Sequence, residues 1–323
     1  MLEITSISAR TWARLGQRGA IFGIALPEII KENKDIRVIT ADLALLSGLD
    51  RFKTSNPDKF INAGIAEQNM MGIAAGLAKE GNCVFATTYA TFIAMRSFEQ
   101  IRHNLGYMKY NVKVVGASSG IVMGMSGNTH YAIEDIAIMR AIPNMTVLSP
   151  ADSVEAVKMA EAVSRLDGPA YIRLTGELNC PMVYKTDYDF EIGKGVVLQQ
   201  GEDVAIIAAG TMVAESIAAA KLLNENGKSV TVINMHTIKP LDTQLLDEVF
   251  AKHKLIVTVE EHSIIGGLGS AVAEYKSGIA DAPVQMMIGM PDMFGKAGEY
   301  KYLLEQYGLT AKAIAERIER KLQ

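Results

Sequence analysis

Short runs rich in Val and Ile alternate with amphipathic segments along this chain, and this alternation is the feature that most limits its fold. Between the runs, the apolar residues recur at helical spacing. Fully apolar strands separated by helices are typical of a mostly parallel sheet covered on both faces. In the first half, strands are predicted at 37–41, 83–87, 112–116, 145–148 and 170–173, and helices at 15–31, 66–80, 92–109, 132–141 and 152–165.

The same alternation begins again after a polar, proline-containing stretch, LNCPMVYKTDYDFEIGKG, which is typical of a linker. We therefore predict an α/β protein of two doubly wound domains with mostly parallel sheets. The first domain would span 1–178, the linker 179–195 and the second domain 196–323. In the second domain, strands are predicted at 204–209, 229–234, 255–259 and 284–287, and helices at 212–226, 242–252, 267–277 and 310–322.

Composition agrees with two domains and excludes some partners. A chain of 323 residues with 49% hydrophobic content can bury two ordinary cores. Its net charge of -4 argues against a nucleic-acid or anionic-membrane partner. Cys83 and Cys180 fit no metal or redox spacing, and no segment reads as a secretory leader or a membrane span. We expect a soluble protein of the cytoplasm.

One carboxylate stands in an apolar, glycine-rich helix start. In FINAGIAEQNMMGIAAGLA (60–78), Glu67 is the single acidic residue. Burial disfavours a charged carboxylate unless something compensates it, so Glu67 is a candidate functional group. The alternative is a partly exposed carboxylate at a helix N-terminus, favoured by the helix dipole.

An aromatic pair follows in ATTYATFIAMRSFEQIR (86–102). Tyr89 and Phe92 are three residues apart, which places them on one helical face or in one tight turn. An aromatic face beside a buried carboxylate suits a flat heteroaromatic ring, which needs stacking on its face and a hydrogen bond at its edge.

These segments, in this order, resemble the C-terminal half of the transketolases. The resemblance rests on GIAEQ, YATF and GNTHYAIEDIA (127–137), and continues through NMHTIKPLD (234–242) and EEHSIIGGLGSAVAE (260–274). More distantly, the chain resembles deoxyxylulose-phosphate synthases and the β subunits of 2-oxoacid dehydrogenases.

The resemblance implies a pyrimidine-binding domain followed by a transketolase C-terminal domain. In that family, thiamine diphosphate binds between the pyrimidine-binding domain and a diphosphate-binding domain, which carries a Gly-Asp-Gly run and holds Mg²⁺. This sequence contains no Gly-Asp-Gly. We therefore expect one subunit of a split transketolase, which needs an N-terminal partner subunit for the cofactor's diphosphate and metal. A dimer of heterodimers is the expected assembly.

The resemblance also implies roles for single residues. Glu67 would hydrogen-bond the aminopyrimidine of thiamine diphosphate, and Tyr89 and Phe92 would hold its ring. Met95 would line the pocket, although a place in the core is an equal alternative. His130 would contact the donor's hydroxyls and assist proton transfer. This chain would supply no metal ligand.

The substrate pocket departs from the family's pattern. Arg14 and Arg173 stand where arginines grip a substrate phosphate, although a surface ion pair is the alternative for each. Ser118 replaces a phosphate-binding histidine and Ser126 an aspartate, while Ser47 would substitute for a phosphate serine only with a shift of register. These changes imply either an acceptor other than the common sugar phosphates or groups supplied by the partner subunit.

The function implied is transfer of a two-carbon ketol unit from a ketose (phosphate) to an aldose (phosphate). Three alternatives remain open: a deoxyxylulose-phosphate-synthase-like enzyme, a 2-oxoacid dehydrogenase β subunit, and a noncatalytic scaffolding paralogue.

Overall fold

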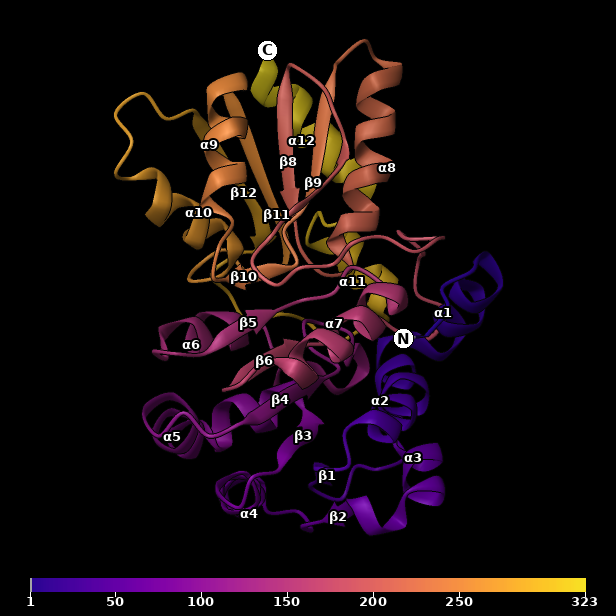
Figure 1. Ribbon diagram of the computed structural model, residues 1–323. Helices are drawn as coiled ribbons and strands as arrows, with labels where there is room; N and C mark the ends of the chain where they lie inside the picture. The colour runs from indigo at the N-terminus through magenta and orange to yellow at the C-terminus, as the bar shows by residue number, and fades with distance from the viewer. Residues whose placement is uncertain (1) are drawn as a thin grey trace.

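The computed structural model describes residues 2–323, in which two mainly parallel sheets lie one above the other (Figure 1). The lower, seven-stranded sheet has the order β10-β5-β6-β4-β3-β1-β2, and the upper, five-stranded sheet has the order β12-β11-β8-β9-β7. Only β10 and β7 pair antiparallel, each at the edge of its sheet. The predicted fold class, two doubly wound α/β domains, is confirmed.

The lower sheet contains every strand predicted for the first half of the chain. Two strands of this sheet, β2 and β10, were not predicted. Each lies at an edge and is three residues long, which is too short to show a hydrophobic pattern. Its strands are β1 (Ile36–Thr40), β2 (Phe60–Asn62), β3 (Cys83–Tyr89), β4 (Val112–Ala117), β5 (Thr146–Leu148), β6 (Ala170–Arg173) and β10 (Thr237–Lys239).

Helices cover both faces of this sheet. On one face α1 (Ser6–Ala20), the π-helix η1 (Ile21–Ala25) and α2 (Leu26–Glu32) pack with α7 (Ser153–Arg165). The other face carries α4 (Glu67–Lys79), η3 (Phe92–Arg96), α5 (Phe98–Gln100), η4 (Ile101–Tyr107) and α6 (Asp135–Ala141). Short turns fill the connections: α3 (Asp50–Ser55), η2 (Pro57–Lys59) and η5 (Gly124–Thr129).

Two predicted helices differ from the observed ones. Before the helix predicted over 15–31, a capping box of Thr5 and Ser8 starts an additional helical segment at Ser6, and a kink at Gly16 (φ 68°) separates the two. The segment predicted as one helix over 92–109 is instead two π-helices, η3 and η4, joined by α5. A π-helix has i→i+5 hydrogen bonds and is frequent at functional sites.

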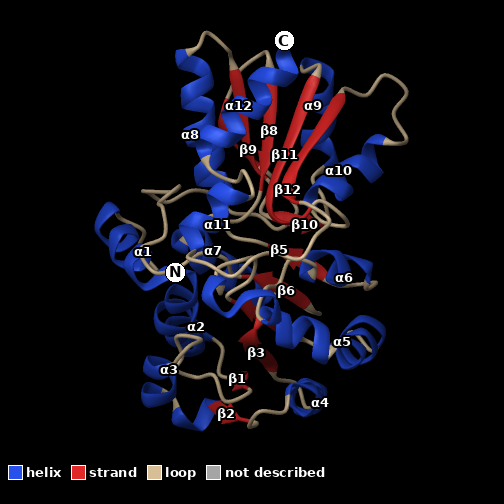
Figure 2. Cartoon of the chain, turned by 180° about the vertical axis from the view of Figure 1, so that it is seen from behind, coloured by secondary structure: helices blue, strands red, loops and turns tan. Residues whose placement is uncertain are grey.

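The upper sheet is covered by α9 and α10 on one face and by α8 and α12 on the other; α12 crosses the face turned to the viewer in Figure 2. Its strands are β7 (Val196–Gln199), β8 (Val204–Ala208), β9 (Val230–Asn234), β11 (Leu255–Ser263) and β12 (Val284–Met290). Its helices are α8 (Met212–Glu225), α9 (Thr243–Lys252), α10 (Leu268–Lys276), α11 (Tyr300–Gln306) and α12 (Ala311–Leu322), of which α11 was not predicted.

Buried polar contacts join the two domains. The Glu261 carboxylate of β11 accepts hydrogen bonds from the Ile121 backbone N–H of the first domain and from the Tyr300 hydroxyl of α11. The Glu155 carboxylate of α7 accepts from Asn234 of β9. Strand β10 also leaves the second domain to pair with β5. Buried carboxylates need such partners, so these contacts fix one domain on the other.

Acid should destabilise the fold through His236, which is fully buried against Phe190. Burial lowers the pKa of His236 to about 4, against about 6.5 in an unfolded chain. Between pH 6.5 and pH 4, His236 is therefore protonated in the unfolded chain but not in the folded chain. The free energy of unfolding falls as the pH drops through this range.

We expect His236 to cost the fold about 2 kcal/mol between pH 7.5 and pH 5. Urea-unfolding midpoints at the two pH values should differ less in His236→Asn than in the wild type. The matched control is His103→Asn, at an exposed position, and it should keep the wild-type pH difference. An unchanged pH difference in His236→Asn would contradict the assignment.

Candidate active site at the carboxyl edge of the first sheet

The predicted site residues follow strands that end at one edge of the lower sheet. Strands β1, β2, β3 and β4 pair parallel, so their carboxyl ends share that edge. Glu67 follows β2, Tyr89 ends β3 and Ser118 directly follows β4. Ligands of open α/β sheets bind outside the carboxyl ends of the strands.

Glu67 is the first residue of α4, and only 7% of it is exposed. The partly exposed alternative therefore does not hold, although the helix N-terminus does favour its negative charge. Its Oε1 accepts a hydrogen bond from Nη1 of Arg96 at 2.9 Å. A cavity of about 410 Å³ opens beside this pair, lined by Ala66, Glu67, Gln68, Asn69 and Arg96.

The side-chain rings of Tyr89, Phe92 and His130 lie close together, and Phe92 contacts the Arg96 side chain that pairs with Glu67. The Phe92 centroid is 5.8 Å from that of Tyr89 and 5.3 Å from that of His130, and Tyr89 and His130 are 6.0 Å apart. These are ordinary separations for interacting rings. The structure thus brings together Tyr89, Phe92 and His130, as the sequence predicts.

The second domain holds the loop that carries His130. Asn128 exchanges two hydrogen bonds with the backbone of Gly295, at 2.7 and 2.8 Å. The Tyr131 hydroxyl donates to the carbonyl of Lys296. Within the loop, the Thr129 hydroxyl lies 2.9 Å from Nδ1 of His130. The imidazole is therefore positioned from both domains.

Arg96 is a site residue that the sequence reading missed. Its guanidinium carbon lies 3.9 Å from the Phe92 ring centroid while it pairs with Glu67. Arg96 follows Phe92 by four residues in η3, a spacing that places two side chains on the same side of a helix. That spacing is the signal that could have found Arg96.

Arginines line a second cavity beside the rings. This cavity has a volume of about 440 Å³ and is lined by Arg14, Arg18 and Arg51 together with Asp50. Arg18 Nη1 donates to the Ser118 hydroxyl at 3.0 Å. Arg18 and Arg51 were missed. Gly16, between Arg14 and Arg18, has a left-handed backbone (φ 68°) that kinks α1, so no helical spacing predicts that both arginines line one cavity.

Electrostatics link this cavity to the ring cluster. Burial lowers the pKa of Arg18, and the nearby Tyr89 hydroxyl partly offsets that effect. Burial likewise raises the pKa of Tyr89, opposed by Arg18. A partly desolvated guanidinium interacts more strongly with an anion than one in water. The cavity can therefore accept an anionic group next to Tyr89.

The remaining predicted residues do not themselves line these two cavities. Ser118 is buried, with a left-handed backbone (φ 54°), and accepts from Arg18. Ser126 is exposed in the loop that carries His130, and Met95 is 40% exposed beside Thr91. Ser47 is fully buried and lines neither cavity.

The structure contradicts the substrate-binding role predicted for Arg173. It is 2% exposed, and its Nε donates to both carboxylate oxygens of Asp135 at 3.0 and 2.9 Å. Its Nη2 donates to the backbone carbonyls of Ala132 and Glu261. Arg173 thus joins the two domains through an internal ion pair, and we remove it from the proposed substrate contacts.

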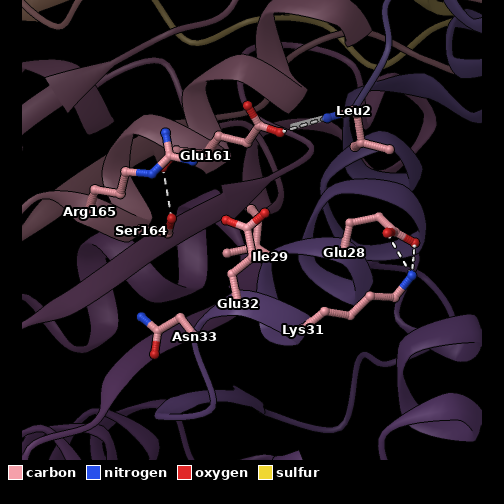
Figure 3. A pocket seen from close by; sticks show the side chains of 9 residues that line it. All are labelled: Leu2, Glu28, Ile29, Lys31, Glu32, Asn33, Glu161, Ser164 and Arg165. Carbon is pink, nitrogen blue, oxygen red and sulfur yellow. Dashed lines mark hydrogen bonds and ion pairs between the residues drawn. The ribbon is translucent and has the colours of Figure 1, made fainter.

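A further cavity, of about 240 Å³, lies between α2 and α7 on the opposite face from α4 (Figure 3). Its charged groups already have partners: Lys31 pairs with Glu28, and Glu161 accepts from the backbone N–H of Leu2. Within residues 2–323, no group of three or more His, Cys, Asp or Glu side chains could hold a metal ion. No helix of the described chain is long and apolar enough to span a membrane.

Comparison with known families agrees with this geometry. The model of the transketolase pyrimidine-binding domain matches residues 18–180, and that of the transketolase C-terminal domain matches residues 193–314. The chain belongs to the transketolase family. Membership in this family implies dependence on thiamine diphosphate.

Three relatives show how far the likeness reaches. The chain is 42% identical to a putative transketolase C-terminal section of Methanocaldococcus jannaschii, over 92% of this chain and 93% of that protein. It is 38% identical to a 1-deoxy-D-xylulose-5-phosphate synthase of Caldanaerobacter subterraneus subsp. tengcongensis, over 92% of this chain but 48% of that protein. A solved structure described as a split gene transketolase, inactive β4 tetramer, shares 42% identity and a TM-score of 0.86, covering 95% of this chain and 98% of its own.

The residues of this transketolase-family chain fit the aminopyrimidine of thiamine diphosphate. The ring needs a hydrogen-bond acceptor at its edge and an aromatic surface against its face. Glu67 offers the first and Phe92 the second. The Arg96 guanidinium, a flat hydrogen-bond donor, already contacts both, which shows that a flat donor fits there.

Proposed function

We propose that this chain is the C-terminal subunit of a split, thiamine-diphosphate-dependent transketolase, which transfers a two-carbon ketol unit from a ketose (phosphate) to an aldose (phosphate). The observation that carries the proposal is the convergence of Glu67, Phe92 and His130 at one sheet edge. The chain would be active only with an N-terminal subunit that binds the diphosphate and Mg²⁺ through a Gly-Asp-Gly run. The inactive β4 assembly of a similar protein supports that requirement.

The roles follow from the contacts. Glu67 would accept a hydrogen bond from the aminopyrimidine of the cofactor, Phe92 would offer its aromatic face to that ring, and Tyr89 and Met95 would help to hold it. Thiamine diphosphate, when bound, supplies the nucleophilic carbon and the electron sink for carbon–carbon cleavage. His130 holds and returns the proton of the donor's hydroxyl, a contribution typically worth about 10²- to 10⁴-fold in rate.

The arginine-lined cavity would bind the substrate's phosphate. Arg14 and Arg18 supply forked donors, and Ser118 sits against Arg18. Ser126, exposed in the loop that carries His130, would contact a sugar hydroxyl. We place the working enzyme in the cytoplasm, because both cysteines are unpaired and buried. Its assembly would be a dimer of heterodimers, since closed two-fold assemblies are the commonest arrangement.

Replacing Arg14 with alanine should weaken this phosphate contact. Hydrogen bonds to charged groups contribute about 1.5–3 kcal/mol, so we expect kcat/KM for a phosphorylated aldose to fall about 10- to 150-fold. Activity on the same aldose without its phosphate should change little. The control, Arg10→Ala, alters an exposed arginine of α1 that does not line the cavity. Equal losses on both aldoses would contradict the assignment.

Reconstitution tests the function as a whole. The chain is mixed with an N-terminal subunit that carries a Gly-Asp-Gly run, recovered by pull-down with this chain from its source organism, and is then assayed for ketol transfer from a ketose phosphate to an aldose phosphate. We expect activity only when both proteins and thiamine diphosphate are present. Formation of 1-deoxyxylulose 5-phosphate from pyruvate and glyceraldehyde 3-phosphate, with release of carbon dioxide, would favour the second candidate, which the synthase relative supports. Pyruvate decarboxylation coupled to a lipoyl group would identify a dehydrogenase subunit, and cofactor-free assembly a scaffold.

A further inference from the structure

Arg96 makes with its own chain the two contacts that a bound aminopyrimidine would need. Its Nη1 donates to Oε1 of Glu67 at 2.9 Å, and its guanidinium lies over the Phe92 ring at 3.9 Å. One flat donor therefore occupies both the carboxylate and the aromatic face. We propose that Arg96 is an internal placeholder for the cofactor's aminopyrimidine, which must displace it to bind. This inference rests on the proposed function.

The physical reason for a placeholder lies at Glu67. Only 9% of its side chain is exposed, and a buried carboxylate without a partner is costly. The Arg96 guanidinium removes that cost while the site holds no cofactor. It also covers an aromatic face that would otherwise meet water.

The Arg96 side chain can move out of the site. Its side chain is 53% exposed, so it can swing into solvent without disturbing the core. Its backbone stays fixed meanwhile, because the carbonyl of Arg96 accepts a hydrogen bond from Nε2 of Gln68 at 3.0 Å. Arg96 also lines the cavity beside Glu67, so its side chain has open space next to it.

Displacement has a measurable cost. A half-exposed ion pair and an exposed cation–π contact are both weak, so together they should reduce the apparent affinity for the cofactor by about threefold to thirtyfold. Removing the guanidinium should raise the apparent affinity for the cofactor by the same factor. A residue that simply supports the site would, when removed, weaken binding instead.

The test measures cofactor affinity in the reconstituted complex by isothermal titration calorimetry, with thiamine diphosphate and excess Mg²⁺ as the probe. We expect Arg96→Ala to bind about threefold to thirtyfold more tightly than the wild type. Arg96→Lys keeps the charge but loses the flat face, so its affinity should lie between the two. Weaker or unchanged binding by Arg96→Ala would overturn the inference.

Arg102→Ala is the matched control. Arg102 has the same 53% side-chain exposure, lies on the same stretch of helices and pairs with an exposed carboxylate, Glu99, away from Phe92. Its loss should leave the affinity unchanged; an equal gain in both variants would show a general charge effect and overturn the inference.

The same titration separates the two proposals. If the wild-type complex binds thiamine diphosphate and transfers ketol units but Arg96→Ala gains nothing, the placeholder inference fails and the proposed function stands. If no variant binds thiamine diphosphate at all, the proposed function fails, and the inference falls with it.

Discussion

Replacing Glu67 with alanine is expected to lower kcat of the reconstituted enzyme by about 10²- to 10⁴-fold, the range for a group that governs proton transfer. Glu67 is the one carboxylate among the residues that line the cavity beside Arg96 and Phe92, so no other acid there can replace it. Steady-state kinetics at saturating cofactor measure the effect.

Stability should barely change in Glu67→Ala. Its ion pair joins a nearly buried carboxylate to a half-exposed arginine, and pairs with a solvent-exposed partner contribute about 0–1 kcal/mol. Thermal unfolding should therefore stay within a few degrees of the wild type. Glu99→Ala, which removes the exposed partner of Arg102, should leave both kcat and stability unchanged. Activity within a few-fold of wild type in Glu67→Ala would remove Glu67 from the site.

Arg173→Met is expected to destabilise the protein by about 3–5 kcal/mol, because it leaves the carboxylate of Asp135 buried without its counterion. Asp135 is fully buried, and it also accepts a hydrogen bond from the Tyr171 hydroxyl, at 2.6 Å. The loss would also release two carbonyls, of Ala132 and Glu261, that meet at the domain boundary. Urea unfolding of the purified chain measures this loss of stability.

Two further variants decide what Arg173 does. Arg102→Met breaks an exposed pair and should cost under about 1 kcal/mol. The double variant Arg173→Met, Asp135→Asn leaves no unpaired charge and should recover part of the lost stability. If Arg173→Met folds as stably as the wild type yet raises KM for phosphorylated substrates, the substrate role predicted from the sequence would be correct after all.

These two residues show where reasoning from sequence succeeds and where it stops. Glu67 stands out because it is the single charge in an apolar helix start, and a desolvated charge needs a reason wherever it lies. Arg173 stands out only through its position in the family's pattern. Its partner, Asp135, is 38 residues away and follows a different strand, so no local spacing announces the pair.

The same distinction separates the two arginine clusters. Phe92 and Arg96 lie four residues apart in η3, a spacing that favours contact between two side chains of one helix. Arg14 and Arg18 are also four residues apart, but Gly16 between them has a left-handed backbone (φ 68°), so the cavity they share depends on that kink. The spacing is visible in both cases, but it predicts the geometry only in the first.

Hydrophobic periodicity and the cost of burying charge are enough to predict the two α/β domains, most strand positions and Glu67 from the sequence, whereas His130, Arg14 and Ser118 were predicted from the family resemblance. Only the tertiary structure decided that β10 crosses into the first sheet, that Arg173 pairs internally and that the second domain's Gly295 holds the loop of His130. Each of these contacts joins residues far apart along the chain. Their free energy exists only once both domains are packed, and so no local pattern records it.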